Sequence, residues 1–113
     1  MKLTITRSNW LHGEKYNSRL LRTSDNKMCC LGFLAKMLGS SDDDIKGQYS
    51  PATAPKVAWI EGMVDSDSVC KLDSRISDHL MQVNDNQLIT DTEREEKLQS
   101  LFSTLGVEVE FVD

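Results

Sequence analysis

The sequence predicts a single α+β domain, spanning residues 1–113, in which a small antiparallel sheet is covered by three to four helices. Three observations predict this class. Both ends of the chain alternate apolar and polar residues with the period of a strand, and the stretches between them have helical spacing. The length of 113 residues is that of one domain, without repeats or low-complexity segments. We therefore expect the N-terminal and C-terminal strands to pair with each other.

The N-terminal segment predicts a strand, a short helix and a second strand. Leu3 and Ile5 alternate with polar neighbours, which is the pattern of a half-buried strand. A short helix is expected to run through Trp10 and Leu11. Residues 19–22 are expected to extend the sheet as a third strand.

The run from Cys29 to Leu38 predicts a helix with one broad apolar face, and Gly39 is typical of the position that ends a helix. Gly32 lies one turn into this helix, where glycine costs about 1 kcal/mol relative to alanine. A glycine at this position of a helix predicts that another part of the backbone passes close by. The apolar face comprises Cys30, Phe33, Leu34, Met37 and Leu38.

The middle of the chain has the weakest pattern. Residues 40–55 predict an irregular loop, and a loop of that length is typical of a mobile or functional segment. A short helix at 56–61 and a possible strand at 69–72 follow, and then Asp73 or Ser74 is expected to cap a longer helix. The stripe of that helix comprises Ile76, His79, Leu80 and Val83.

The C-terminal segment predicts a helix followed by a strand. Residues 90–93, with the sequence Thr-Asp-Thr-Glu, fit a capping box at the start of the helix, and Gly106 is expected to end it. The helix buries residues at spacings of three and four, namely Leu98, Leu101, Phe102 and Leu105. In the strand, Val107, Val109 and Phe111 are expected to point inward.

Composition and charge are those of a soluble globular domain, with 39% hydrophobic residues, 27% charged residues and a net charge of −5. Residues 1–36 carry a net +5, residues 37–80 carry −4 and residues 81–113 carry −6. We expect the two ends to pack side by side and neutralise each other, and a polarised binding surface is the alternative. The sequence shows neither a signal-peptide core nor ~18 consecutive apolar residues, so we expect a cytoplasmic protein without a membrane span.

The cysteines and histidines predict neither a catalytic nor a metal site. Cys29 and Cys30 are adjacent, and we expect them to pack in the core, because the spacing encodes no base such as His12 or His79 beside a nucleophile. Adjacent thiols also lack the gaps of two to four residues that zinc sites use. We expect no cofactor. Trp10 and Trp59 are expected to anchor the core, with partner contact as the alternative.

The charged residues suggest two binding surfaces. An acidic face near the C-terminus would dock a host protein with a basic patch and argues against nucleic acid as a partner. Its candidate partner-binding residues are Glu95, Glu96, Glu108 and Glu110. Alternatively, Arg19 and Arg22 in the basic N-terminal third would hold a small anionic ligand.

A set of short motifs resembles small proteins encoded by bacteriophages and prophages that carry a Cys-Cys-Leu-Gly motif. The motifs are Trp10, then Gly13-Glu14-Lys15-Tyr16, then Leu21-Arg22, then Cys29-Cys30-Leu31-Gly32, and later Asn84-Asp85 after a helix. The match covers residues 10–39 well and residues 55–62 and 79–85 in part. The acidic tail shows no correspondence.

The resemblance implies a phage origin and carries over no functional residue. Small accessory phage proteins commonly bind a host macromolecule, block a defence system or redirect an enzyme. We therefore expect a non-enzymatic protein that binds and modulates a host macromolecule in the bacterial cytoplasm. A binder that sequesters a small anionic ligand, such as a nucleotide messenger, is the alternative, and a cysteine-dependent enzyme is the second alternative. No motif identifies the host, the target or the oligomeric state.

Overall fold

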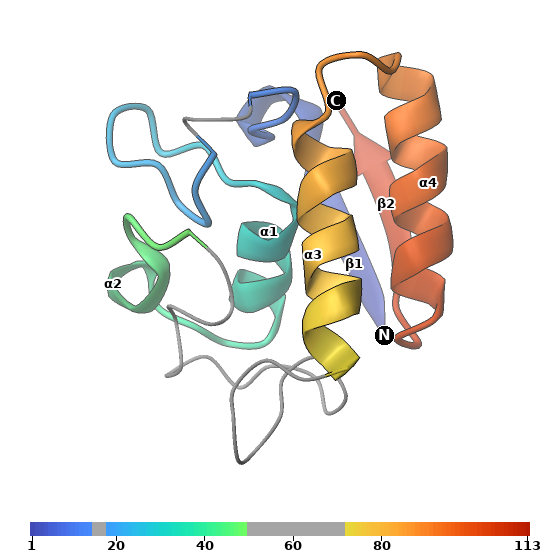
Figure 1. Cartoon of the computed structure of the whole chain (residues 1–113). Helices are drawn as coiled ribbons and strands as arrows, with labels where there is room; N and C mark the ends of the chain where they lie inside the picture. Colours follow the sequence, from blue (N-terminus) through green and yellow to red (C-terminus); the bar gives the residue numbers. More distant parts are fainter. Residues whose placement is uncertain (15–17, 50–71) are drawn as a thin grey trace.

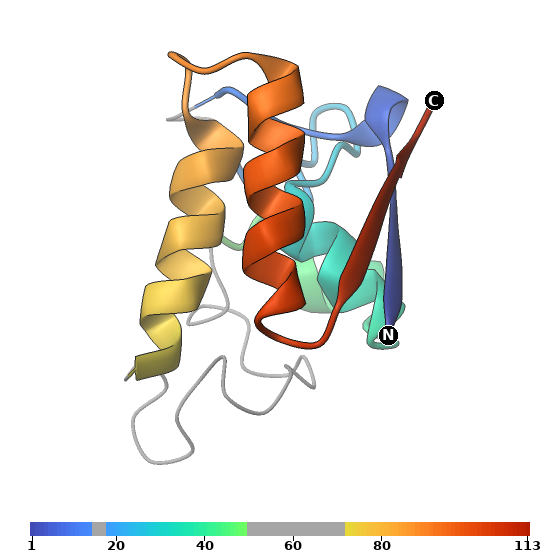
Figure 2. The ribbon, with the colours of Figure 1, turned by 90° about the vertical axis from the view of Figure 1, so that its right-hand side faces the viewer.

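A computed structural model describes residues 1–14, 18–49 and 72–113, which form a two-stranded sheet with helices on one side of it (Figures 1 and 2). The expected helix at 56–61, most of the possible strand at 69–72, Trp59 and Cys70 lie outside these described residues. The elements in chain order are β1 (Lys2–Thr6), a 3₁₀ turn η1 (Arg7–Asn9), α1 (Cys30–Met37), α2 (Asp42–Ile45), α3 (Leu72–Asp85), α4 (Asp91–Ser103) and β2 (Glu108–Val112).

The N-terminal and C-terminal strands pair with each other, but they pair in parallel, so the prediction of an antiparallel sheet is wrong. Leu3 lies opposite Val109, and Ile5 lies opposite Phe111. A parallel pair needs a crossover connection, and α1, α3 and α4 provide it on one side of the sheet (Figure 2). Since α4 runs back beside α3, the chain enters β2 in the direction of β1 (Figure 2).

Two further predictions for the N-terminal third are also wrong. Residues 19–22 do not join the sheet, and Leu21 makes only an isolated bridge with Lys46. The expected helix through Trp10 is the 3₁₀ turn η1, which ends one residue earlier. Trp10 itself is extended and bridges Met28, through the Leu11 N–H bond to the Met28 carbonyl oxygen at 2.7 Å and the Met28 N–H bond to the Asn9 carbonyl oxygen at 3.0 Å. The backbone groups of this region are therefore paired through turns and bridges.

The predicted helix at the Cys-Cys run is confirmed as α1. The close approach expected at Gly32 is confirmed as well, because a Cβ at this position would lie 1.8 Å from the Leu20 carbonyl oxygen. Gly39 follows the helix with a φ of 93°, a conformation that glycine adopts without strain. The helix therefore packs directly against the backbone of the preceding segment.

The remaining helices agree in part with the predictions. Thr90 caps α4 as expected, and its hydroxyl accepts a hydrogen bond from the Glu93 N–H at 3.1 Å. The α3 helix begins at Leu72, before the expected cap, and His79 is exposed rather than part of the apolar stripe. The region expected to be an irregular loop contains the single turn α2, which buries Ile45 completely.

The core lies between the sheet and the helices and collects residues from every part of the described chain. Its fully buried large side chains are Leu3, Ile5, Leu11, Leu20, Leu31, Leu34, Ile45, Leu80, Leu98, Phe102 and Val107. The inward face expected for each terminal strand is confirmed at Leu3, Ile5, Val107 and Val109, and Phe111 is partly buried.

Candidate functional site

The Cys-Cys run marks the start of α1 and lies in the core. Cys29 is the residue before the helix and Cys30 is its first residue, and they are 3% and 0% exposed. Burial raises the pKa of the Cys29 thiol to about 12 and raises that of the Cys30 thiol well above its ordinary value. A thiol with a raised pKa stays protonated at neutral pH, so it is a weak nucleophile and a weak metal ligand.

The described residues do not pair these thiols with a base. The Cys30 thiol is 3.8 Å from the Leu80 carbonyl oxygen, to which it donates. His12 stacks on the Trp10 ring, with 4.0 Å between ring centroids, and its Nδ1 lies 3.0 Å from the Trp10 carbonyl oxygen. Its Nε2 lies 3.5 Å from a carboxylate oxygen of Asp91. Both ring nitrogens of this histidine therefore face partners other than a cysteine.

The polar centre beneath the Cys-Cys run is Asn84, a fully buried residue in the last turn of α3. Its Oδ1 accepts hydrogen bonds from the Trp10 indole N–H at 2.8 Å and from the Cys30 backbone N–H at 3.1 Å. Its Nδ2 donates to the Leu11 carbonyl oxygen at 2.9 Å. The Cys29 side chain makes no capping hydrogen bond to α1. The Asn84 carboxamide, which belongs to α3, therefore accepts the hydrogen bond of the first N–H of α1.

Sequence reasoning missed this role of Asn84 and placed it only at the end of a helix. One signal was available, because Asn84 follows Leu80 by four residues and so falls on the apolar stripe of α3. A polar side chain on such a stripe must find partners in the core. Trp10, Cys30 and Asn84, which belong to the motifs quoted above, thus meet at one point and hold three segments together.

The four candidate partner-binding glutamates lie on two elements, α4 (Glu95 and Glu96) and β2 (Glu108 and Glu110). Arg7 forms a two-bond pair with Glu95, at 2.9 Å for each bond, and a further bond of 3.0 Å with Asp113. Lys2 pairs with Glu110 at 2.9 Å. The N-terminal cations therefore neutralise part of the acidic C-terminal segment, as expected from the distribution of charge.

The two candidate anion-binding arginines are engaged within the chain. Arg22 pairs with Asp25 at 2.6 Å and with Glu14 at 3.1 Å. The bond from Arg22 lowers the pKa of Asp25 to about 2. The guanidinium of Arg19 lies 4.0 Å from the centroid of the Tyr49 ring, which is a cation–π geometry. The charge of Arg22 is thus compensated by two carboxylates.

The most exposed large apolar side chain in the described residues is Leu88, which is 94% exposed in the loop between α3 and α4. The buried Arg94 holds this loop by donating to the carbonyl oxygens of Asn86 and Ile89 and by pairing with Asp91. The Asn86 side chain also accepts the Leu88 N–H at 2.8 Å. The hydrogen bonds thus hold the backbone of the loop on both sides of the exposed Leu88 side chain.

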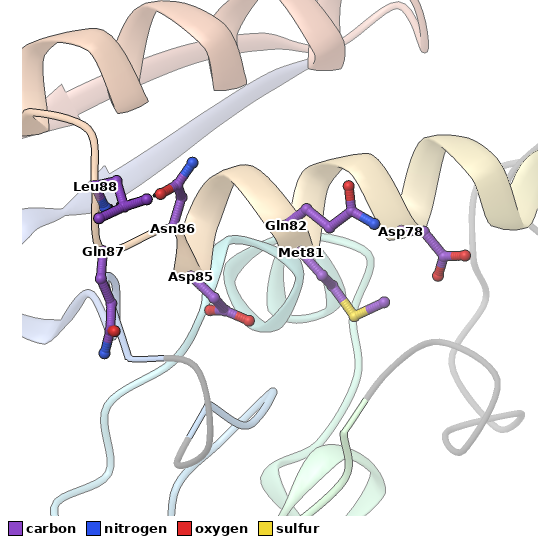
Figure 3. A pocket seen from close by; sticks show the side chains of 7 residues that line it. All are labelled: Asp78, Met81, Gln82, Asp85, Asn86, Gln87 and Leu88. Atoms are coloured by element: carbon purple, nitrogen blue, oxygen red, sulfur yellow. Dashed lines mark hydrogen bonds between the residues drawn. The ribbon is translucent and has the colours of Figure 1, made fainter.

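A cavity of about 600 Å³ adjoins this loop along the last turns of α3 (Figure 3). We call its lining the α3 groove, which consists of Asp78, Met81, Gln82, Asp85, Asn86, Gln87 and Leu88. Asp78, Met81 and Asp85 project to the same side of the helix in Figure 3, as spacings of three and four residues require. The sequence did not predict the groove, because nothing in the residues around a loop leucine distinguishes an exposed leucine from a buried one.

The described residues show neither a metal site nor a membrane-spanning helix. In ranges 1–14, 18–49 and 72–113, no group of three or more His, Cys, Asp or Glu side chains is placed to hold a metal ion. None of the helices in the same ranges has the length and apolar character that crossing a membrane requires. Comparisons of the chain with protein-family models, with curated proteins and with solved structures give no match. Function is therefore inferred from the geometry of the site.

Proposed function

We propose that the protein is a non-enzymatic accessory protein of a bacteriophage or prophage that binds a host protein in the bacterial cytoplasm and modulates it, for example by blocking a defence system. Leu88 carries this proposal. This large apolar side chain is 94% exposed on a loop that a buried arginine holds, so it takes little part in the packing of the described residues. Apolar side chains on a loop whose backbone is already held can anchor protein interfaces, because little backbone entropy is lost when they bind.

The chemistry of the α3 groove favours a protein as the partner. Met81 supplies a flexible and polarisable surface, which is common where a protein must fit a varied partner. Gln82 and Gln87 offer amide groups at the rim, and Asp78 and Asp85 add negative charge. The partner surface is therefore expected to combine an apolar pocket for Leu88 with a basic patch, since complementary charge steers association. Acidic charge of this kind disfavours nucleic acid.

The two alternative functions have less support. A cysteine-dependent enzyme needs a thiolate that a substrate can reach, whereas Cys29 and Cys30 are buried with raised pKa values. A binder of small anions needs cations that are available to the ligand, whereas Arg22 is held by Glu14 and Asp25. Binding of a host protein through the α3 groove requires neither condition.

Affinity capture from host lysate, with quantitative mass spectrometry, tests this proposal. We compare the native chain with Leu88→Asp, which places a charge where an apolar anchor is expected. Ser24→Asp adds the same charge at an exposed turn position and is the matched control. A third variant reverses the charges of Glu95, Glu96, Glu108 and Glu110 and tests the acidic face separately.

The expected result is a host protein that the native chain and Ser24→Asp capture equally and that Leu88→Asp captures at least tenfold less, about 1.4 kcal/mol of binding free energy. Circular dichroism must show that every variant is folded. Equal capture by Leu88→Asp and the native chain contradicts the use of the α3 groove. Loss of capture only in the charge-reversed variant assigns the interface to the acidic face.

A further inference from the structure

The α3 groove combines carboxylates with an apolar floor, and this combination specifies a ligand chemistry. Asp78 and Asp85 flank Met81 on one side of α3, and Leu88 lies at the loop end of the groove (Figure 3). The volume of about 600 Å³ lies within the range of cavities that bind organic groups. An apolar chain that ends in a positive charge fits these features better than a neutral or an anionic group.

Asp85 is the carboxylate best placed to select a cation. Its Oδ1 accepts a hydrogen bond from the Asn84 Nδ2 at 2.9 Å, which fixes its orientation on the rigid end of α3. Partial burial is the main cause that raises the pKa of Asp85, and hydrogen bonds from Asn84 and Ser18 act in the opposite direction. A carboxylate that has lost part of its hydration interacts more strongly with an incoming cation than one in bulk water.

The chain itself supplies no such cation in the part that the structure describes. Neither Asp78 nor Asp85 is in salt-bridge contact with a lysine or arginine there. The charge of the nearby Arg94 acts on Asp85 in the direction that lowers its pKa, but Arg94 forms its ion pair with Asp91 and donates to two loop carbonyl oxygens. A partly desolvated carboxylate that forms no ion pair within residues 1–14, 18–49 and 72–113, and that lies beside Met81, is thus the feature that a ligand would complete.

We propose that the α3 groove binds an arginine side chain, with its aliphatic stem against Met81 and its guanidinium paired with Asp85. This inference rests on the proposed function, because the arginine would belong to the host protein. Guanidinium is favoured over ammonium, since its planar fork can bond a carboxylate twice and it is less strongly hydrated. Asp78, on the turn before Met81, adds negative potential along the path of the stem.

The test uses n-butylguanidinium, which reproduces the arginine side chain, as the probe of the full-length protein. Heteronuclear NMR follows the backbone amides during titration, with n-butanol and butyrate as matched uncharged and anionic probes. We expect saturable shifts at Met81, Gln82, Asp85 and Leu88 with n-butylguanidinium alone. Asp85→Asn keeps the shape of the side chain and should weaken binding about five- to tenfold, the loss of roughly one charge-assisted contact.

The control variant is Asp43→Asn, which removes an exposed carboxylate from α2 and should leave binding unchanged. Asp78→Asn should weaken binding less than Asp85→Asn. The inference is overturned if butyrate or n-butanol produces the same shifts, if n-butylguanidinium produces none that saturate, or if Asp85→Asn binds like the native chain. Should capture of the host protein still depend on Leu88 in that case, the proposed function stands and only the assignment of arginine fails.

Discussion

The buried amide of Asn84 serves three segments of the chain at once. Its two polar atoms bond the Trp10 indole, the first N–H of α1 and the Leu11 carbonyl, all at 2.8–3.1 Å. Trp10 would otherwise bury its indole N–H without a partner, and the start of α1 would lack a cap. A shorter or purely apolar side chain at this position cannot replace these bonds.

Replacement of Asn84 by leucine keeps the number and branching of the side-chain heavy atoms but leaves these buried groups unsatisfied. Asn84→Leu should therefore lower the free energy of unfolding by about 2–4 kcal/mol. Urea unfolding followed by circular dichroism measures this change. Gln87→Ala, at an exposed position of the following loop, is the control and should stay within about 0.5 kcal/mol of the native value. A variant as stable as the native chain would show that the Asn84 bonds are dispensable.

At Gly32, by contrast, the structure leaves no room for any side chain. On helix propensity alone, Gly32→Ala should stabilise α1 by about 1 kcal/mol. The Leu20 carbonyl oxygen would lie 1.8 Å from the new Cβ, so the two segments must separate. We expect a net loss of at least about 2 kcal/mol in urea unfolding. Lys36→Ala, on the exposed side of α1, is the control, and a gain in stability for Gly32→Ala would contradict the close approach.

At the level of elements, the capping of α4 is the prediction that sequence supported best. Thr90→Ala removes the acceptor of the Glu93 N–H and should cost about 1 kcal/mol. Thr92→Ala, two residues later and exposed, removes the same atoms without breaking a cap. Thermal unfolding should therefore show a lower midpoint for Thr90→Ala alone, and equal midpoints for the two variants would argue against the cap.

Local patterns predicted α1, α4, the two terminal strands and the close approach at Gly32, because each depends on residues within one or two turns. The direction of β2 relative to β1 depends on how α3 and α4 reverse the chain before it. The alternation of apolar residues at Val107 and Val109 would be the same in a parallel and in an antiparallel strand. The segment at 19–22 has the composition of a strand, but its backbone bonds to Gln48 and to Lys27 instead of to the sheet. The α3 groove and the Asn84 contacts arise from segments far apart in sequence, so no local pattern predicted them.

Over the whole molecule, the charge asymmetry of the chain is partly balanced where the two ends meet. Arg7 joins α4 to the last residue through Glu95 and Asp113. Arg7→Ala should lower the midpoint of thermal unfolding at low ionic strength, and the difference should shrink near 1 M salt, where the Debye length is about 3 Å. Lys46→Ala removes an exposed cation that forms no ion pair with the other described residues, and it is the control. A difference that does not depend on salt would contradict an electrostatic origin.

The Cys-Cys run builds the core at the start of α1 and presents no reactive thiol to solvent. The rate of thiol labelling of Cys29 and Cys30 tests it most directly. Cys70→Ser provides the background, because Cys70 lies outside the described residues. Burial of both side chains predicts that neither thiol is labelled at neutral pH in the folded protein faster than the chain unfolds. Both should react fully in denaturant. Rapid stoichiometric labelling of both thiols at neutral pH, with the circular dichroism spectrum unchanged, would contradict the claim.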